Sequence, residues 1–232
     1  MSNPTRPDSG ASPSGSGNRR IDQGQQSRAR LLAEARRLFE RDGYAATSTE
    51  SLLATTGLTR GALYHHFRDK KDLFAAVCDA VHADLAQAID AATAGITDPS
   101  AQLVAGSVAW VEAVSEPGPR QVLLIDAPAV LGAAEWQALD ERHGFRQLRE
   151  AVAQIVQPEG SAAERRADAL AAALNGAINA LVHWRAQHDG PASRVALHAA
   201  LQQLCAAVLT PDMPPPAQRP ATIRRAARSR SR

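Results

Sequence analysis

The chain has 232 residues, with 26 basic and 24 acidic side chains and a formal net charge of +2 at pH 7. Alanine supplies about a fifth of the residues and aromatic side chains only 4%, which favours an all-α fold, because alanine is the best helix former and a poor strand former. Two widely separated cysteines support neither a disulfide framework nor a thiolate zinc site, and no apolar run is long enough to span a membrane, so we expect a reduced, cytoplasmic protein without a secretory signal.

The near-neutral total conceals an uneven distribution of charge. Residues 19–72 carry a net charge of +4, residues 73–210 carry −7 and residues 211–232 carry +5. A basic N-terminal segment followed by an acidic body indicates that one end of the chain meets a polyanion.

Both ends of the chain are expected to lie outside the fold. Residues 1–23 are predicted to form a disordered arm, because its first part is rich in Pro and Ser and almost devoid of large apolar side chains. Residues 211–232, rich in Pro and Arg, are predicted to form a disordered basic tail, which adds either non-specific attraction to DNA or solubility.

The first two helices are predicted from apolar spacing and turn residues. Apolar side chains three and four positions apart over residues 31–39 indicate the first helix, which Gly43 ends. A short second helix follows, with Thr47 or Ser48 as its N-cap and Gly57 at its end.

Two more helices follow directly. Thr59 caps a short helix that runs to about His66. Asp69 caps a longer one with a regular apolar face, and Gly95 and Pro99 end it.

The rest of the chain is also predicted to be helical. We expect helices at about 100–115, 119–131 and 133–156, in a region that several prolines cut or kink. The apolar run Val122–Ile125 is compatible with a strand, but it has no neighbouring partner strand and a helix is favoured. Two further helices with continuous apolar faces are separated by a break at Gly190.

Residues 47–66 therefore hold two short helices with a tight turn between them, in a net-basic segment. This is the layout of a helix-turn-helix, whose second helix fits the major groove of DNA. Pairs of short helices are common, so the layout alone permits this interpretation without requiring it.

Particular residue types at fixed gaps carry a more specific signal. They are Gly43–Thr49 (GYAATST), Leu52, Gly57–Phe67 (GLTRGALYHHF) and Lys70–Phe74 (KKDLF), with Ala35, Leu38 and Phe39 upstream. Over about residues 28–75 the chain resembles the DNA-binding domain of TetR-family (tetracycline-repressor-like) transcriptional regulators, although Leu53 stands where alanine is commoner. The resemblance implies an N-terminal helix-turn-helix three-helix domain at 24–70 and a C-terminal helical ligand-sensing and dimerisation domain at 71–210.

The resemblance also implies which residues meet DNA. Hydroxyls at the start of the second helix would hold a phosphate, the first turn of the third helix would face base edges, and later residues would touch the sugar-phosphate backbone. Arg60 can donate two hydrogen bonds to guanine, although arginines also bind phosphate, and Ala62 can pack on a thymine methyl. The expected DNA-binding residues are Thr47, Ser48, Thr49, Thr59, Arg60, Gly61, Ala62, Tyr64, His65 and Lys70.

Several of these assignments have alternatives. Thr47 can act only as a cap, and Tyr64 can be a half-buried core residue. Lys71 is expected to be a solvated charge. Arg19 and Arg20 are candidates for an arm near the minor groove.

In the body, the resemblance implies a cavity for a small-molecule effector. Asp126 and His143 are the expected polar contacts, and the other candidates are large apolar side chains, for each of which plain core packing is the favoured alternative. The candidate ligand-binding residues are Trp110, Leu123, Leu124, Asp126, Trp136, His143, Phe145 and Leu148.

The apolar faces of the last two helices predict a four-helix interface between two copies of the chain. A dimer also places two recognition helices about one DNA turn apart, which lets it read a palindrome. The residues expected at this interface are Leu174, Ile178, Leu181, Leu197, Leu201, Leu204 and Val208.

Taken together, these features predict a ligand-responsive DNA-binding regulator, of the repressor type, with double-stranded DNA, a second copy and an unidentified effector as partners. No phosphate-binding loop, nucleophile elbow or metal-ligand spacing is found, so neither an enzyme nor a cofactor is expected. The alternative is a helical adaptor that binds protein partners through its acidic body and attaches to DNA only non-specifically.

Overall fold

The computed structural model describes the backbone of residues 15–209 and the side chains of residues 23–207. Within this part of the chain every regular element is helical, which confirms the all-α fold class. The elements are α1 (Gly15–Ala46), α2 (Thr49–Thr56), α3 (Arg60–His66), α4 (Lys70–Thr93), α5 (Pro99–Ser115), α6 (Pro117–Arg120), the π-helical segment η1 (Gln121–Asp126), α7 (Ala127–Leu131), α8 (Ala133–Arg142), α9 (Gly144–Val156), α10 (Ser161–Gln187) and α11 (Pro191–Leu209).

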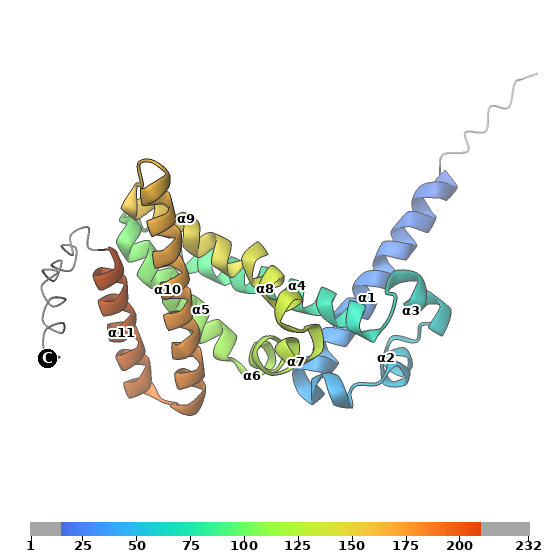
Figure 1. The fold of residues 1–232 in the computed structure, drawn as a ribbon. Coiled ribbons are helices and arrows are strands. Elements are labelled where there is room, and N and C mark those ends of the chain that lie inside the picture. The colour runs from blue at the N-terminus through green and yellow to red at the C-terminus, as the bar shows by residue number, and fades with distance from the viewer. Residues whose placement is uncertain (1–14, 210–232) are drawn as a thin grey trace, which may run out of the picture.

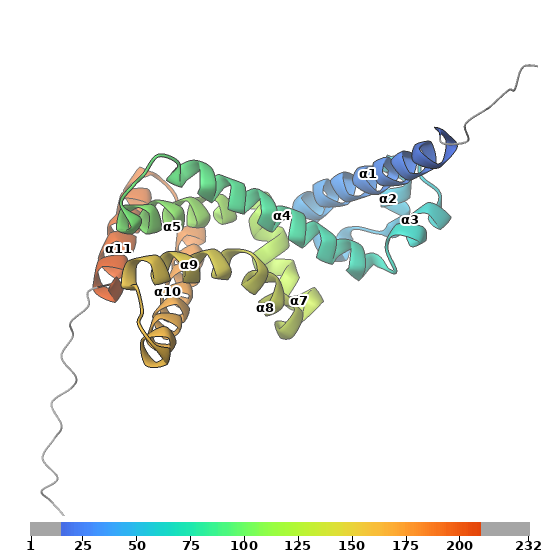
Figure 2. The same cartoon turned by 90° about the horizontal axis from the view of Figure 1, so that it is seen from above.

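The molecule is elongated, with its two ends joined by α4 (Figures 1 and 2). Helices α1, α2 and α3 gather at one end, whereas α9, α10 and α11 lie at the other. Helix α4 packs against α1 at its start and along α5 in the body, while α10 packs against α5, α9 and α11. Helix α4 therefore contacts both halves of the molecule, and η1 and α6 of the body also pack against α1.

The short helices begin and end at residues that the sequence marks. Ser48, rather than Thr47, is the N-cap of α2, and its hydroxyl and that of Ser51 form a reciprocal capping box. Gly57 ends α2 in the left-handed region at φ 67°. The expected caps of α3 and α4 are confirmed: Thr59 accepts a hydrogen bond from the Ala62 amide, and Asp69 accepts one from the Asp72 amide.

Of the two predicted limits of the first helix, the start is corrected and the break at Gly43 is confirmed. Helix α1 begins at Gly15, so residues 15–23 are helical rather than part of a disordered arm; after Pro13 the sequence holds no proline to prevent a helix. Gly43 interrupts the helical backbone of α1 as expected, with φ 79° and ψ 166°, and a further short helical stretch follows to Ala46. Residues 1–14 and 210–232, which include most of the predicted arm and the whole predicted tail, lie outside the described residues.

The body helices are more broken than expected. The predicted helix over 119–131 consists of α6, η1 and α7, and Val122–Ile125 lies inside the π-helical segment, which confirms the helical interpretation over the strand. The predicted helix over 133–156 is two helices, because His143 has a non-helical backbone at φ −119° and ψ −94° between α8 and α9. No helix in the described part of the chain is long and apolar enough to cross a membrane.

Candidate nucleic-acid interface and effector cavity

The helix-turn-helix is held firmly on α1. Leu52, Leu63 and Phe67 are buried between the helices, and Arg30 Nη2 donates a 2.8 Å hydrogen bond to the carbonyl of Thr56 at the end of α2. These contacts fix α2 and α3 relative to the rest of the N-terminal end, so the outer surface of α3 is presented by a rigid base.

The first turn of α3 is open to solvent. Thr59 Oγ1 accepts a 3.2 Å hydrogen bond from the Ala62 amide, so the Thr59 side chain is held in place as the N-cap of α3. The Arg60 side chain is 65% exposed, with one guanidinium nitrogen 3.8 Å from a Glu50 carboxylate oxygen and its guanidinium 5.9 Å from the Tyr64 ring centroid. An exposed ion pair of this length contributes little, so Arg60 can exchange Glu50 for another acceptor at small cost.

Gly61 lies in this turn, and nothing within the protein requires glycine there. A Cβ added there would meet only Thr59 Oγ1, at 3.9 Å, and the residue has an ordinary helical backbone. The fold therefore tolerates a side chain at this position, as it does at Gly24 and Gly176, where a Cβ would meet nothing within 4 Å. At Gly61 the missing side chain leaves room for a partner to approach α3 closely.

The other predicted surface residues of this end are mostly accessible. Tyr64 is 44% exposed and is not a core residue, and His65 is exposed beside it. Ser48 is exposed at the start of α2, while half-buried Thr49 donates a 3.2 Å hydrogen bond to Glu50.

Thr47 is the exception, and its expected phosphate contact is corrected. Its side chain is only 2% exposed, and Oγ1 donates a 2.9 Å hydrogen bond to the carbonyl of Gly43. The hydroxyl thus secures the turn between α1 and α2 and is not available at the surface.

The two lysines at the start of α4 differ in their surroundings. Lys70 Nζ lies 4.0 Å from the Tyr44 ring centroid, and partial burial lowers the pKa of its ammonium group. Lys71 is not a free solvated charge, because its Nζ lies 2.9 Å from a carboxylate oxygen of Glu135 and donates to the Leu131 carbonyl. Lys71 therefore ties the start of α4 to α7 and α8.

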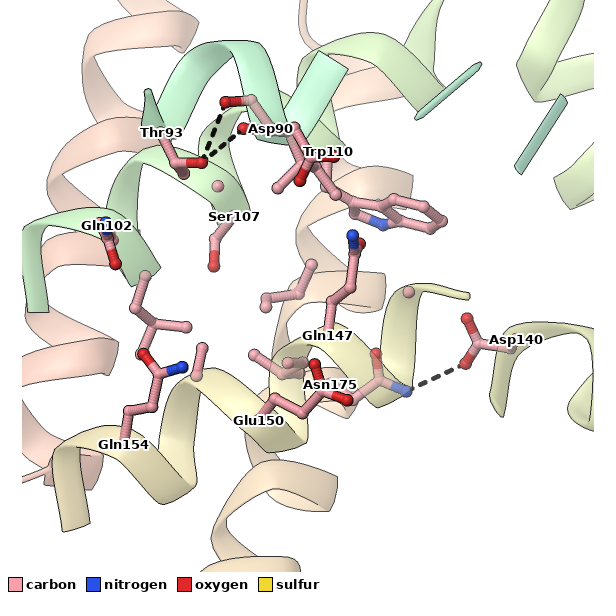
Figure 3. A pocket seen from close by; sticks show the side chains of 17 residues that line it. Asp90, Thr93, Gln102, Ser107, Trp110, Asp140, Gln147, Glu150, Gln154 and Asn175 are labelled. Carbon is pink, nitrogen blue, oxygen red and sulfur yellow. Dashed lines mark hydrogen bonds between the residues drawn. The ribbon is translucent and has the colours of Figure 1, made fainter. Parts of the chain in front are cut away.

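A cavity of about 290 Å³ lies in the body between α4, α5, α9 and α10 (Figure 3). Of the eight predicted ligand-binding residues, only Trp110 and Leu148 line it. Polar side chains from five helices surround the space, including Asp90 on α4, Ser107 on α5, Asp140 on α8 and Asn175 on α10.

The remaining six candidates do not line this cavity, and each has a partner or a packing place elsewhere. Asp126 Oδ2 accepts a 2.8 Å hydrogen bond from the Tyr44 amide, which joins η1 to the kink in α1. Trp136 Nε1 donates to the carbonyl of buried Leu123 at 3.3 Å. Leu124, Phe145 and Trp136 are partly buried against the core.

His143 instead belongs to a stack of rings that reaches the cavity wall. Its Nε2 lies 2.9 Å from a carboxylate oxygen of Asp79, and its ring stacks on His82, which in turn stacks on Trp110. Burial lowers the pKa of His82 to about 4, with the nearby charge of His143 acting in the same direction. Trp110 is one of the expected ligand-binding residues and lines the cavity. Nothing in the sequence indicates this stack, whose members come from α4, α5 and the junction between α8 and α9.

Comparison with known proteins agrees with both halves of this arrangement. Residues 31–77 match the family profile "Bacterial regulatory proteins, tetR family", and residues 100–208 match "Tetracyclin repressor-like, C-terminal domain". A solved TetR-family transcriptional regulator from Pectobacterium atrosepticum is 31% identical, with a TM-score of 0.63, over 81% of this chain and 96% of that one. The chain belongs to the TetR family of transcriptional regulators.

Curated relatives named as HTH-type regulators match over only short stretches of this chain. The regulator AcrR of Shigella flexneri is 43% identical over 53 residues, which is 23% of this chain and 25% of that protein. The repressor AcnR of Corynebacterium glutamicum is 40% identical over 63 residues, or 27% of this chain and 34% of that protein. The matches thus span about a quarter to a third of these relatives, all of which are named as transcriptional regulators rather than enzymes.

The predicted dimer residues of this TetR-family chain need a correction. Four of the seven are buried among the chain's own helices, because the apolar stripes of α10 and α11 face α5 and α9. These four are Leu174, Ile178, Leu197 and Leu201. Leu181 and Leu204 are half-buried against the same core, and the side chain of Val208 lies outside the described residues.

Among charged and polar side chains, α10 and α11 also turn a set of small residues outward. Val195 is 71% exposed on α11. We call the following exposed set the outer face: Ala169, Ala172, Ala173, Gly176, Ala180, Val195 and Ala199.

Proposed function

We propose that this TetR-family protein is a ligand-responsive transcriptional repressor that binds a palindromic operator as a homodimer and is released by a small-molecule effector. The observation that carries the proposal is the open first turn of α3, where Arg60 is exposed and Gly61 has no intramolecular reason to be glycine. Recognition helices enter the major groove with their N-terminal residues on the base edges, and a missing side chain permits a close approach.

Within this proposal the surface residues divide into two groups. Arg60 and Ala62 read base edges, with Arg60 leaving Glu50 for a guanine. The others position the helix on sugar and phosphate, which carry no sequence information. This positioning group is Ser48, Thr49, Thr59, Tyr64, His65 and Lys70.

The second copy of the chain is proposed to dock on the outer face of α10 and α11. Small side chains let helices approach closely, and the larger apolar residues behind them are already used in the core of each chain. Two recognition helices are then available to read two half-sites of one operator in the bacterial cytoplasm.

Helix α4 is the proposed route from effector to DNA. It supplies Ile89, Asp90 and Thr93 to the cavity wall, and its first turn holds Lys70 and Lys71 next to α3. An effector that binds better to one position of α4 than to another shifts the population that fits the operator.

Footprinting on the DNA upstream of the protein's own gene tests the proposal. The repressor account predicts protection of one palindrome with two half-sites about one turn apart. The alternative, a helical adaptor with an acidic body, predicts protection of no defined sequence, so absence of a footprint across that DNA contradicts the proposal.

A further inference from the structure

The charge of the cavity wall distinguishes it from an ordinary apolar pocket. Asp90, Asp140 and Glu150 contribute carboxylates, and no Lys, Arg or His occurs among the described residues that line the space. Carboxylates placed around one cavity attract a cation and repel an anion, and low-dielectric walls strengthen both effects.

The carboxylates differ in how far the protein neutralises them. Glu150 lies 3.3 Å from an Arg146 nitrogen at the surface. Asp140 Oδ2 accepts a 3.3 Å hydrogen bond from Asn175, and burial raises the pKa of this carboxyl. In the described part of the chain neither Asp90 nor Asp140 has a basic side chain within ion-pair distance, so their charge is compensated least.

A neutral acceptor points to the same chemistry. The Oε1 atom of Gln147 is buried and has no hydrogen-bond donor in the described structure. The Gln147 amide lies below the Trp110 ring, inside the ring of polar side chains that Figure 3 shows. A buried acceptor without a donor costs free energy. Because Oε1 has almost no accessible surface, a ligand that brings an N–H group recovers this free energy only after the Gln147 side chain turns towards the space.

Trp110 supplies the complementary apolar wall. Its ring packs against Gly144, where a Cβ would come within 3.3 Å of the indole, so the α8–α9 junction holds the ring in place. An indole face attracts a cation more strongly than other aromatic side chains do.

We propose that this cavity binds a small organic cation, an amine with an apolar or aromatic body, whose ammonium group lies between Asp140, Asp90 and Gln147 and whose body packs on Trp110. The inference rests on the proposed function in treating the cavity as the effector site, and it adds the chemical class of the effector.

Three probes of matched size test the ligand class on the full-length protein without DNA: phenethylammonium, 2-phenylethanol and phenylacetate. Isothermal titration at pH 7.5 is expected to give the tightest binding for the ammonium ion and the weakest for the carboxylate. We expect the ammonium ion to bind at least about tenfold more tightly than the alcohol, because hydrogen bonds to charged groups are stronger than neutral ones.

Single substitutions test which carboxylates bind the ammonium group. Asp140→Asn is expected to weaken phenethylammonium binding by about tenfold and to leave 2-phenylethanol within about twofold. Asp90→Asn, at an exposed position of α4 with little risk to folding, is expected to weaken only the ammonium ion, by a smaller factor. Glu141→Gln is the matched control, because Glu141 lies next to Asp140 in sequence but pairs with Arg149 outside the cavity.

Equal affinity for the three probes, no binding of the ammonium ion at 10 mM, or unchanged ammonium binding in both Asp variants overturns the ligand class. Operator release is measured separately, by fluorescence anisotropy of labelled operator DNA. Carboxylate-dependent binding that leaves the operator complex intact upholds the ligand class and contradicts the effector part of the proposed function.

Discussion

The DNA-binding end and the body are both helical, but most of their helices begin in different ways. Helices α2, α3 and α4 each begin at a side-chain cap, provided by Ser48, Thr59 and Asp69. From α6 to α10 no element has a side-chain cap bond, and one segment is π-helical. The body helix α5 does begin at a side-chain cap, Asp98, and both ends bury polar side chains: Thr47 and Thr56 at the DNA-binding end, His82 and Arg185 in the body.

This difference has a mechanical meaning. Each cap contributes about 1 kcal/mol to its helix, so the DNA-binding end holds its short helices with local bonds that do not depend on the body. The body has a break at His143 and a cavity between its helices, which gives it more than one way to pack. We infer that a stiff reading end is attached to a deformable sensing end.

The largest expected effect separates the core of the body from its outer face. Leu201→Asp is expected to destabilise the fold by about 4 kcal/mol or more, because it buries a charge without a partner. Ala172→Asp, on the exposed outer face, is expected to leave urea unfolding of the monomer nearly unchanged but to shift sedimentation from dimer to monomer. A dimeric Ala172→Asp variant places the interface elsewhere.

Acid is expected to weaken the body through His82. Burial lowers its pKa to about 4 from an ordinary value of 6.5, so the unfolded chain binds the proton more readily than the folded one. This contribution to stability is complete above pH 6.5 and is lost as the pH falls towards 4, by up to about 3 kcal/mol. Urea unfolding between pH 7 and 4 should show a smaller pH dependence in His82→Phe; an identical dependence in both proteins rules out His82 as its source.

Matched cap variants test the contrast between the two ends. Ser48→Ala removes a capping box and is expected to cost about 1 kcal/mol in the free energy of unfolding. Ser161→Ala, at the first residue of α10 where no side-chain cap bond exists, is expected to cost less than about 0.5 kcal/mol. Equal costs in urea unfolding contradict the contrast.

Gly61→Ala is expected to change stability and DNA binding in opposite directions. Alanine in a helix is more favourable than glycine by about 0.5–1 kcal/mol, and the fold has room for its Cβ. The same methyl group stands between α3 and the groove, so operator affinity should fall while the melting temperature rises. A variant with unchanged operator affinity shows that α3 does not approach DNA at this residue.

The two ends also differ in how far their structure follows from sequence. Ser48, Thr59 and Asp69 cap helices through bonds that span three residues, so local patterns locate them. The prediction that Thr47 contacts phosphate is wrong. A hydroxyl at the start of a helix is compatible with a surface contact, but also with the buried hydrogen bond to the Gly43 carbonyl that Thr47 makes.

The cavity depends on packing that no local pattern records. The Asp126 carboxylate accepts a hydrogen bond from the Tyr44 amide, 82 positions away in the sequence. The Lys71 ammonium donates one to the Leu131 carbonyl, 60 positions away. The His143 ring is hydrogen-bonded to the Asp79 carboxylate of α4. Apolar spacing identifies the buried faces of the body helices, but not which polar residues end up facing one another across a space.

A binding titration on operator and random DNA at several salt concentrations tests the central claim, that the first turn of α3 reads sequence while its neighbours only position it. Arg60→Ala is expected to cost about 1–3 kcal/mol per half-site on the operator, with little effect on random DNA and a relaxed preference at one symmetric base pair. Lys70→Ala should weaken binding to both DNAs alike and reduce the salt slope by about one per half-site. Equal losses on both DNAs for Arg60→Ala, with base preference intact, would contradict the account.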